Sequence, residues 1–187
     1  MKHFVIYIPG LGDDVSIRNK LLTWWRFRDV QVQLVPMNWY GEQDFKKKQT
    51  LVLQAFDAAA SKGFAVSLIG ESAGASMAIN AAALRPATHR VVTIAGLNDT
   101  FTDISPSISR RSPSFVKSVK AIKSSMALID TNKIHTIRGL LDFTVYARHT
   151  RIDSAHNHVI PAIGHIVTIG LCLTLFSPYV LSLIKRG

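Results

Sequence analysis

Residues 65–79 decide the fold, and they read Ala-Val-Ser-Leu-Ile-Gly-Glu-Ser-Ala-Gly-Ala-Ser-Met-Ala-Ile. An apolar run stops at Gly70, Ser72 follows two residues later, and an alanine-rich segment of strong helix formers begins after Gly74. This pattern predicts a buried strand, a sharp turn and a helix, with Ser72 at the apex of the turn. Glycines suit such a turn, because larger side chains would collide with neighbouring elements. The turn also places Ser72 at a helix N-terminus, which favours developing negative charge.

The rest of the chain alternates strands with helices. Apolar, β-branched runs predict further strands at 4–8, 30–35, 91–95, 134–137 and 159–160. Apolar residues at helical spacing predict helices at 15–28, 43–61, 72–84 and 115–129, and a last helix from His165 that breaks at Pro178. Residues 97–114, rich in Ser, Asp, Thr and Pro, are predicted to be loop. The alternation is typical of a parallel sheet with right-handed crossovers and helices on both faces.

Length and composition are those of one globular domain, with 187 residues, 48% hydrophobic and 18% charged. The single cysteine, Cys172, leaves no intramolecular disulfide to form and fits a reducing compartment. The N-terminal apolar run is short and ends at Pro9-Gly10, so it reads as a strand and not as a signal peptide. These features predict a cytoplasmic protein.

The net charge of +10 is unevenly distributed, because residues 104–187 carry 11 basic and only 3 acidic side chains. A basic half can attract an anionic substrate, a membrane surface or nucleic acid, or can simply form a solvated face. No nucleic-acid-binding motif accompanies the charge, so we expect no nucleic-acid partner.

The five residues Gly70-Glu71-Ser72-Ala73-Gly74 follow the pattern Gly-x-Ser-x-Gly. Between a buried strand and a helix, this segment resembles the nucleophile elbow of the α/β-hydrolase family. The resemblance covers nearly the whole chain. It implies a three-layer α/β sandwich with a mostly parallel six-stranded sheet of order 2-1-3-4-5-6. The family's usual first two antiparallel strands are missing, which makes this a minimal version. Residues 97–133 lie where the family often inserts a lid, and we expect at most a small one there.

A serine hydroxyl needs a base to take its proton and an acid to orient that base. In the family the acid follows the serine and precedes the histidine. Residues 134–145 resemble the family's strand-Gly-x-x-Asp-x-x-Val segment, with Gly139, Asp142 and Val145 matching. The resemblance therefore implies Asp142 as the acid. Asp99 is the reserve, since an acid after the fourth strand is a variant of the family, and Asp103 and Asp153 are weaker rivals.

Of the seven histidines, only His165 follows a predicted strand and a glycine and opens a helix. Residues 159–165 resemble the family's last strand and catalytic histidine loop, which implies His165 as the base. His149, His156, His158 and Asp153 match no standard zinc spacing. We therefore expect neither a metal nor a cofactor.

The family resemblance also locates the groups that would stabilise an oxyanion. Pro9-Gly10-Leu11-Gly12 resembles the family's His-Gly-x-Gly turn, with Pro9 in place of the histidine. It implies that the backbone N–H groups of Leu11 and Ala73 are the donors. Loops at the strand ends predict a pocket suited to an acyl or aromatic group, lined by Leu11, Trp39, Tyr40, Leu97, Phe101 and Phe143.

These observations predict a serine hydrolase that cleaves a small-molecule carboxylic ester or thioester through an acyl-enzyme, although acyl transfer and peptide hydrolysis use the same machinery. Two alternatives stay open: an inactive hydrolase-fold protein that binds a ligand or partner, and a basic protein that docks on anionic membrane. Residues 166–184 carry no charge over 19 positions, near the lower limit for a membrane span. A buried final helix is the favoured interpretation, with membrane contact or a homodimer surface as the alternatives.

Overall fold

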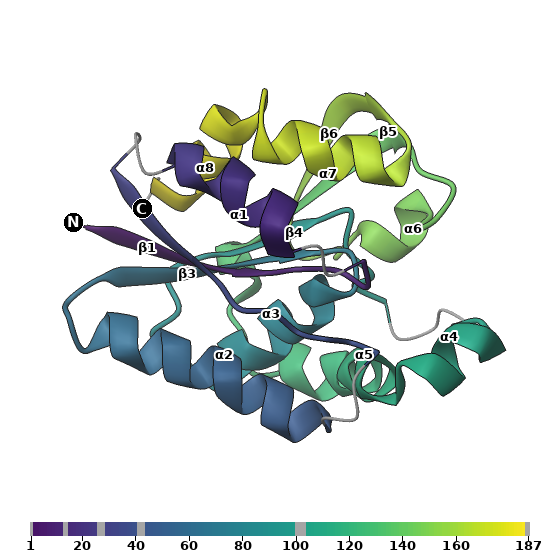
Figure 1. Cartoon of the computed structure of the whole chain (residues 1–187), viewed down its shortest axis with the longest axis horizontal. Helices are drawn as coiled ribbons and strands as arrows, with labels where there is room; N and C mark the ends of the chain where they lie inside the picture. Colours follow the sequence, from purple (N-terminus) through teal and green to yellow (C-terminus); the bar gives the residue numbers. More distant parts are fainter. Residues whose placement is uncertain (1, 13–14, 26–28, 41–43, 100–103, 186–187) are drawn as a thin grey trace.

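A sheet of six parallel strands forms the centre of the computed structural model, which describes residues 2–12, 15–25, 29–40, 44–99 and 104–185 (Figure 1). The strands are β1 His3–Ile8, β2 Val30–Leu34, β3 Ala65–Glu71, β4 Val91–Ile94, β5 Ile134–Leu141 and β6 His156–Ile163. Their order in the sheet is β2-β1-β3-β4-β5-β6, and every neighbouring pair is parallel. The predicted fold class and strand order are confirmed.

Helices cover both faces of the sheet (Figure 1). One face carries α2 Phe45–Ala60, α3 Gly74–Ala83 and α5 Pro113–Met126, and the other carries α1 Val15–Thr23, α7 His165–Leu173 and α8 Ser177–Lys185. The shorter helices are α4 Pro106–Arg111, α6 Ala147–Thr150 and a 3-10 turn at Thr131–Lys133. Because right-handed crossovers return each strand in the same direction, all six carboxyl ends meet at one edge of the sheet.

Each face of the sheet has its own hydrophobic core. Phe56 of α2, Met77 of α3 and Phe115 of α5 pack in the first. Trp25, which follows α1, packs with Cys172 of α7 in the second. Strand β3 contributes to both cores, because its side chains alternate between the two faces and all but the first are buried. Burial on both faces explains why the strand lacks polar alternation.

The segment predicted to be loop contains α4. Ser105 caps this helix by accepting a hydrogen bond from the Ile108 N–H, and Pro106 occupies its first turn. A Ser-Pro pair thus begins a helix here, although the same composition is typical of loops. Strands β5 and β6 are eight residues each, longer than predicted, because their pairing with each other extends them.

The last helix is interrupted just before Pro178, since α7 ends at Leu173 and α8 begins at Ser177. Proline fits the first turn of α8, where its missing N–H is not needed. No helix among the described residues is by itself long and apolar enough to cross a membrane. The pair α7 and α8, bent by 67° at the break, meets those criteria only when both helices are counted together.

Candidate active site

The turn at Ser72 connects β3 to α3 and holds the serine in strained backbone. Ser72 has a φ of 48°, in the left-handed region that non-glycine residues rarely adopt. Gly70 and Gly74 allow the turn to close. A Cβ at Gly70 would overlap the carbonyl oxygen of Gly74, and a Cβ at Gly74 would overlap that of Ile8. The strain is retained because strand β1 packs directly against the turn.

Three side chains from distant parts of the chain form a hydrogen-bonded line at the carboxyl edge of the sheet. His165 Nε2 lies 2.9 Å from Ser72 Oγ, and His165 Nδ1 lies 2.7 Å from Asp142 Oδ2. Since an ionised carboxylate can only accept, the imidazole carries its proton on Nδ1 and presents a lone pair from Nε2 to the serine hydroxyl. The side chains of His165 and Asp142 are only 9% and 3% exposed, so water competes little for these bonds.

The backbone orients the Asp142 carboxylate. Its Oδ1 accepts the N–H groups of Thr144 at 2.8 Å and Val145 at 3.0 Å, leaving Oδ2 for His165. The Gly164 N–H donates to the Leu141 carbonyl at 2.7 Å, which ties the loop before His165 to the end of β5. The histidine and its carboxylate are therefore held at a defined separation.

Asp99, the reserve acid, pairs with a different histidine. Its Oδ2 lies 2.9 Å from His149 Nδ1, and Arg148 Nε donates to His149 Nε2 at 2.9 Å. Of the weaker rivals, Asp153 is exposed after α6, and Asp103 lies outside the described residues. Asp142 is thus the carboxylate that meets the histidine beside Ser72.

A buried carboxylate braces the turn that carries Leu11. Glu71, with 0% exposure, accepts the Gly10 N–H at 3.1 Å and Arg18 Nε at 2.6 Å, and it also accepts the hydroxyl of Tyr7. Burial and the neighbouring Glu71 carboxylate raise the pKa of Tyr7 well above its usual range, so the phenol keeps its proton and donates. Sequence reasoning missed this cluster. The signal was a charged residue, Glu71, inside an otherwise apolar and small-residue elbow.

A pocket of about 440 Å³ opens beside Ser72. Its walls are formed by Leu11, Ala73, Leu97, Ile104, Ser105, Ile108, Phe115, Thr144, Val145, Tyr146, Arg148 and His149. Leu11 and Ala73, whose N–H groups were predicted as oxyanion donors, thus lie in the same wall as the serine. The pocket residues from α4 and α5 were not predicted from the sequence, because residues 97–114 were interpreted as loop and residues 97–133 as a small lid.

Three residues predicted to line the pocket lie outside its walls. Trp39 is fully buried below it, with its indole N–H donated to the Pro9 carbonyl at 3.0 Å and its ring edge-on to Phe115. Tyr40 is 47% exposed, with Arg111 4.8 Å above its ring, and Phe143 is 73% exposed at the surface. Leu97 does line the pocket, and Phe101 lies outside the described residues. Trp39 instead supports the Pro9-Gly10-Leu11 turn from behind.

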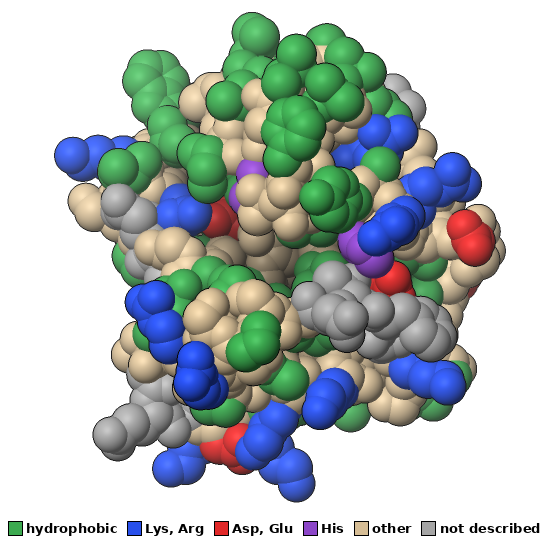
Figure 2. Space-filling model, turned by 90° about the vertical axis from the view of Figure 1, so that its right-hand side faces the viewer, with side chains coloured by type: hydrophobic (Ala, Val, Ile, Leu, Met, Phe, Trp, Pro, Cys, Tyr) green, Lys and Arg blue, Asp and Glu red, His purple; other side chains and the backbone are tan. Residues whose placement is uncertain are grey.

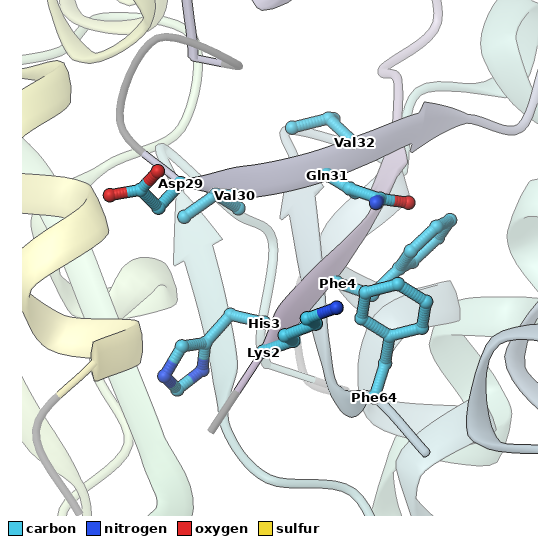
Figure 3. Close-up of a pocket in the computed structure, with 8 residues that line it drawn as sticks. All are labelled: Lys2, His3, Phe4, Asp29, Val30, Gln31, Val32 and Phe64. Atoms are coloured by element: carbon cyan, nitrogen blue, oxygen red, sulfur yellow. The ribbon is translucent and has the colours of Figure 1, made fainter. Parts of the chain in front are cut away.

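A larger hollow, of about 580 Å³, lies at the amino ends of β1 and β2, the opposite edge of the sheet from Ser72 (Figure 3). Figure 3 shows the rings of Phe4 and Phe64 side by side, with His3 pointing away from them. Its walls also include Lys2, Asp29 and Gln31, but no serine or cysteine nucleophile. Across the described ranges, no three His, Cys, Asp or Glu residues gather in a way that could hold a metal ion.

No protein-family model matches the sequence, and no curated protein matches it significantly. Solved structures do match. Est1E from Butyrivibrio proteoclasticus is 15% identical with a TM-score of 0.71, and the match covers 98% of this chain and 89% of that one. A monoacylglycerol lipase of Paleococcus ferrophilus is 11% identical with a TM-score of 0.68, covering 98% and 95%.

Dienelactone hydrolase from Anabaena variabilis is 18% identical with a TM-score of 0.65, covering 97% of this chain and 84% of that one. At these identities the likeness is one of architecture, and it extends over nearly the full length of each pair. Together with the strand order and the elbow at Ser72, it shows that the chain has the fold of the α/β-hydrolase superfamily.

Proposed function

We propose that this protein is a serine hydrolase that cleaves a carboxylic ester or thioester through an acyl-enzyme intermediate. The observation that carries the proposal is the line Ser72–His165–Asp142, with spacings of 2.9 and 2.7 Å and very little solvent access at its inner end. A serine, a neutral imidazole and an orienting carboxylate in this order are the parts that nucleophilic acyl transfer requires.

In the first step, Ser72 Oγ attacks the carbonyl carbon of the substrate while His165 Nε2 takes the hydroxyl proton. Asp142 stabilises the imidazolium that forms and holds its tautomer. The N–H groups of Leu11 and Ala73 stabilise the negative charge on the carbonyl oxygen, a contribution of about 3 kcal/mol for each such donor. Collapse of the intermediate breaks the bond to the alcohol or thiol, which leaves with the proton from His165.

In the second step, water attacks the acyl-enzyme carbonyl while His165 takes one of its protons. The second tetrahedral intermediate collapses, the Ser72 oxygen leaves and recovers the proton from His165, and the carboxylic acid is released. Glu71 acts as a positioning residue, because its hydrogen bond to the Gly10 N–H fixes the turn that carries Leu11.

The pocket walls support an acyl substrate with an apolar chain. Leu97, Ile104, Ile108 and Phe115 provide a hydrophobic wall, while Arg148 and His149 lie at the polar side. A volume of about 440 Å³ is at the small end of ligand pockets, which favours a short or medium chain over a bulky substrate.

Two assays test the proposal. A fluorophosphonate probe should label the wild-type protein and leave the Ser72→Ala variant unlabelled. A series of aryl esters of increasing chain length should show a Ser72-dependent optimum at short or medium chains. Folded wild-type protein that neither reacts with the probe nor hydrolyses any ester of the series would contradict the proposal and favour a ligand-binding role.

A further inference from the structure

Exposed hydrophobic side chains gather beside the pocket, on the two short segments that flank Asp142 and His165. Each is more than half exposed, and we call them the mouth patch: Leu140, Leu141, Phe143, Tyr146, Ile163, Ile166 and Val167. Seven large apolar side chains within residues 140–146 and 163–167 far exceed the scattered single exposures that soluble surfaces normally show.

The two segments of the mouth patch lie against each other. Leu141 pairs with Ile163 across β5 and β6, and the Gly164 N–H donates to the Leu141 carbonyl. Tyr146 continues the patch to the wall of the pocket. Figure 2 views the carboxyl edge of the sheet and shows hydrophobic side chains over the upper part of this face, above a hollow near its centre.

The side chains of the mouth patch belong to neither hydrophobic core. In α7, Ile166 is 73% exposed and Val167 is 51% exposed, whereas Thr168, Ile169 and Cys172 are buried against the sheet. The first turn of α7 therefore extends beyond the part of the helix that the core covers. Part of residues 166–184 was the sequence-based alternative for contact with a membrane or a second copy, and of that segment only Ile166 and Val167 belong to the mouth patch.

The charged side chains around the mouth patch are mainly basic. Arg148 lies with its guanidinium 5.7 Å from the ring of Tyr146, and Arg110 and Arg111 are exposed at the end of α4, on the other side of the pocket. We call these three arginines the basic rim. Of the nearby acids, Asp142 is 3% exposed and bonded to His165, and Asp99 is paired with His149. Figure 2 shows Lys and Arg side chains beside and below the hydrophobic area, with few Asp or Glu.

We propose that the mouth patch and the basic rim dock the protein on an anionic lipid surface. The hydrophobic side chains enter the boundary between headgroups and acyl chains, and the arginines meet the anionic headgroups. Charge favours lipid over a second copy of the chain, because a two-fold contact through this face would bring the basic rims of both copies into one interface. The docked orientation turns the pocket opening toward the lipid. Docking through the mouth patch does not require the chemistry at Ser72.

Sedimentation with lipid vesicles tests the proposal on the full chain, in the wild type and in Ser72→Ala. We expect binding to vesicles of phosphatidylcholine mixed with phosphatidylglycerol, weaker binding to phosphatidylcholine alone, and release by high salt. The double variant Phe143→Ser/Ile166→Ser should bind the mixed vesicles about tenfold more weakly or worse. Arg110→Gln should weaken binding about fivefold.

The matched control is Leu128→Ser/Leu175→Ser, which removes two side chains that are 67% and 70% exposed outside the mouth patch. It should bind like the wild type. The proposal would be overturned if the control lost as much binding as Phe143→Ser/Ile166→Ser. It would also be overturned if the wild type bound both kinds of vesicle equally, or if the folded wild type bound neither. A dimer in sedimentation velocity that Phe143→Ser/Ile166→Ser dissociates would overturn it in favour of a second copy.

Discussion

The buried carboxylate behind the elbow offers a sharp test of how the site is held. Replacing Glu71 with Gln keeps the shape of the side chain but removes its charge. The wild-type carboxylate accepts hydrogen bonds from Tyr7, Gly10 and Arg18 at a position with 0% exposure. In Glu71→Gln, the Arg18 guanidinium, whose side chain is 14% exposed, loses its ion pair with Glu71. The Gly10 N–H keeps an amide oxygen as its acceptor.

The expected loss of stability follows from these contacts. Breaking a buried ion pair by removing one partner costs about 3–5 kcal/mol, and the partial exposure of Arg18 places this case near the lower end, at about 3 kcal/mol. For a domain of this size, a loss of that much unfolding free energy corresponds to a melting temperature about 6–12 °C lower. Differential scanning calorimetry or a thermal melt followed by circular dichroism measures it directly.

The same variant should lower kcat for an aryl ester by about tenfold with little change in KM, a fraction of the loss from removing an oxyanion donor outright. The double variant Glu71→Gln/Arg18→Met serves as the control, since it removes both charges and should recover part of the lost stability. A melting temperature for Glu71→Gln within 2 °C, or about 0.5 kcal/mol, of the wild type would refute the reasoning.

Three further predictions concern the elbow, the choice of acid and the response to pH. Gly74→Ala should prevent folding, because the added Cβ would overlap the Ile8 carbonyl oxygen. Gly170→Ala should raise the free energy of unfolding by about 1 kcal/mol in urea titrations, because the added Cβ meets no atom within 4 Å and alanine favours a helix more than glycine does. Asp142→Asn should lower kcat on an aryl ester by about 10⁴-fold. Asp99→Asn disturbs the pair with His149 but leaves the Asp142–His165 bond in place, so it should lower kcat by less than about tenfold. Burial and the neighbouring His156 and His158 lower the pKa of His135 to about 4 from 6.5. Between these two pKa values, the unfolded chain binds more protons at His135 than the folded chain does. The contribution of His135 to the free energy of unfolding should therefore fall as the pH drops through this range and stay constant above it. The urea midpoint of His135→Thr should fall less than that of the wild type between about pH 7 and about pH 5.

Local patterns along the chain were sufficient to predict the architecture. Uninterrupted apolar strands such as residues 65–69 indicated burial on both faces, and their alternation with helices indicated a parallel sheet. Ser72 could be picked out by the Gly-x-Ser-x-Gly pattern between a strand and a helix, and the family resemblance of residues 134–145 and 159–165 implied Asp142 and His165. The resemblance favoured Asp142 and kept Asp99 as the reserve acid, since both follow strands whose carboxyl ends meet at the same edge.

Only the tertiary structure decided which side chains face each other. The pairing of Asp99 with His149, the bracing of Gly10 by Glu71, and the burial of Trp39 below the pocket depend on contacts between segments far apart in the chain. Such contacts leave no periodic signal, because they are set by how neighbouring strands and helices pack and not by the preferences of one segment. The exposure of the mouth patch also depends on tertiary packing. In the sequence, the apolar residues at the start of α7 look like the buried residues later in that helix. Only the packed structure shows that the core covers the later residues and leaves the first turn exposed.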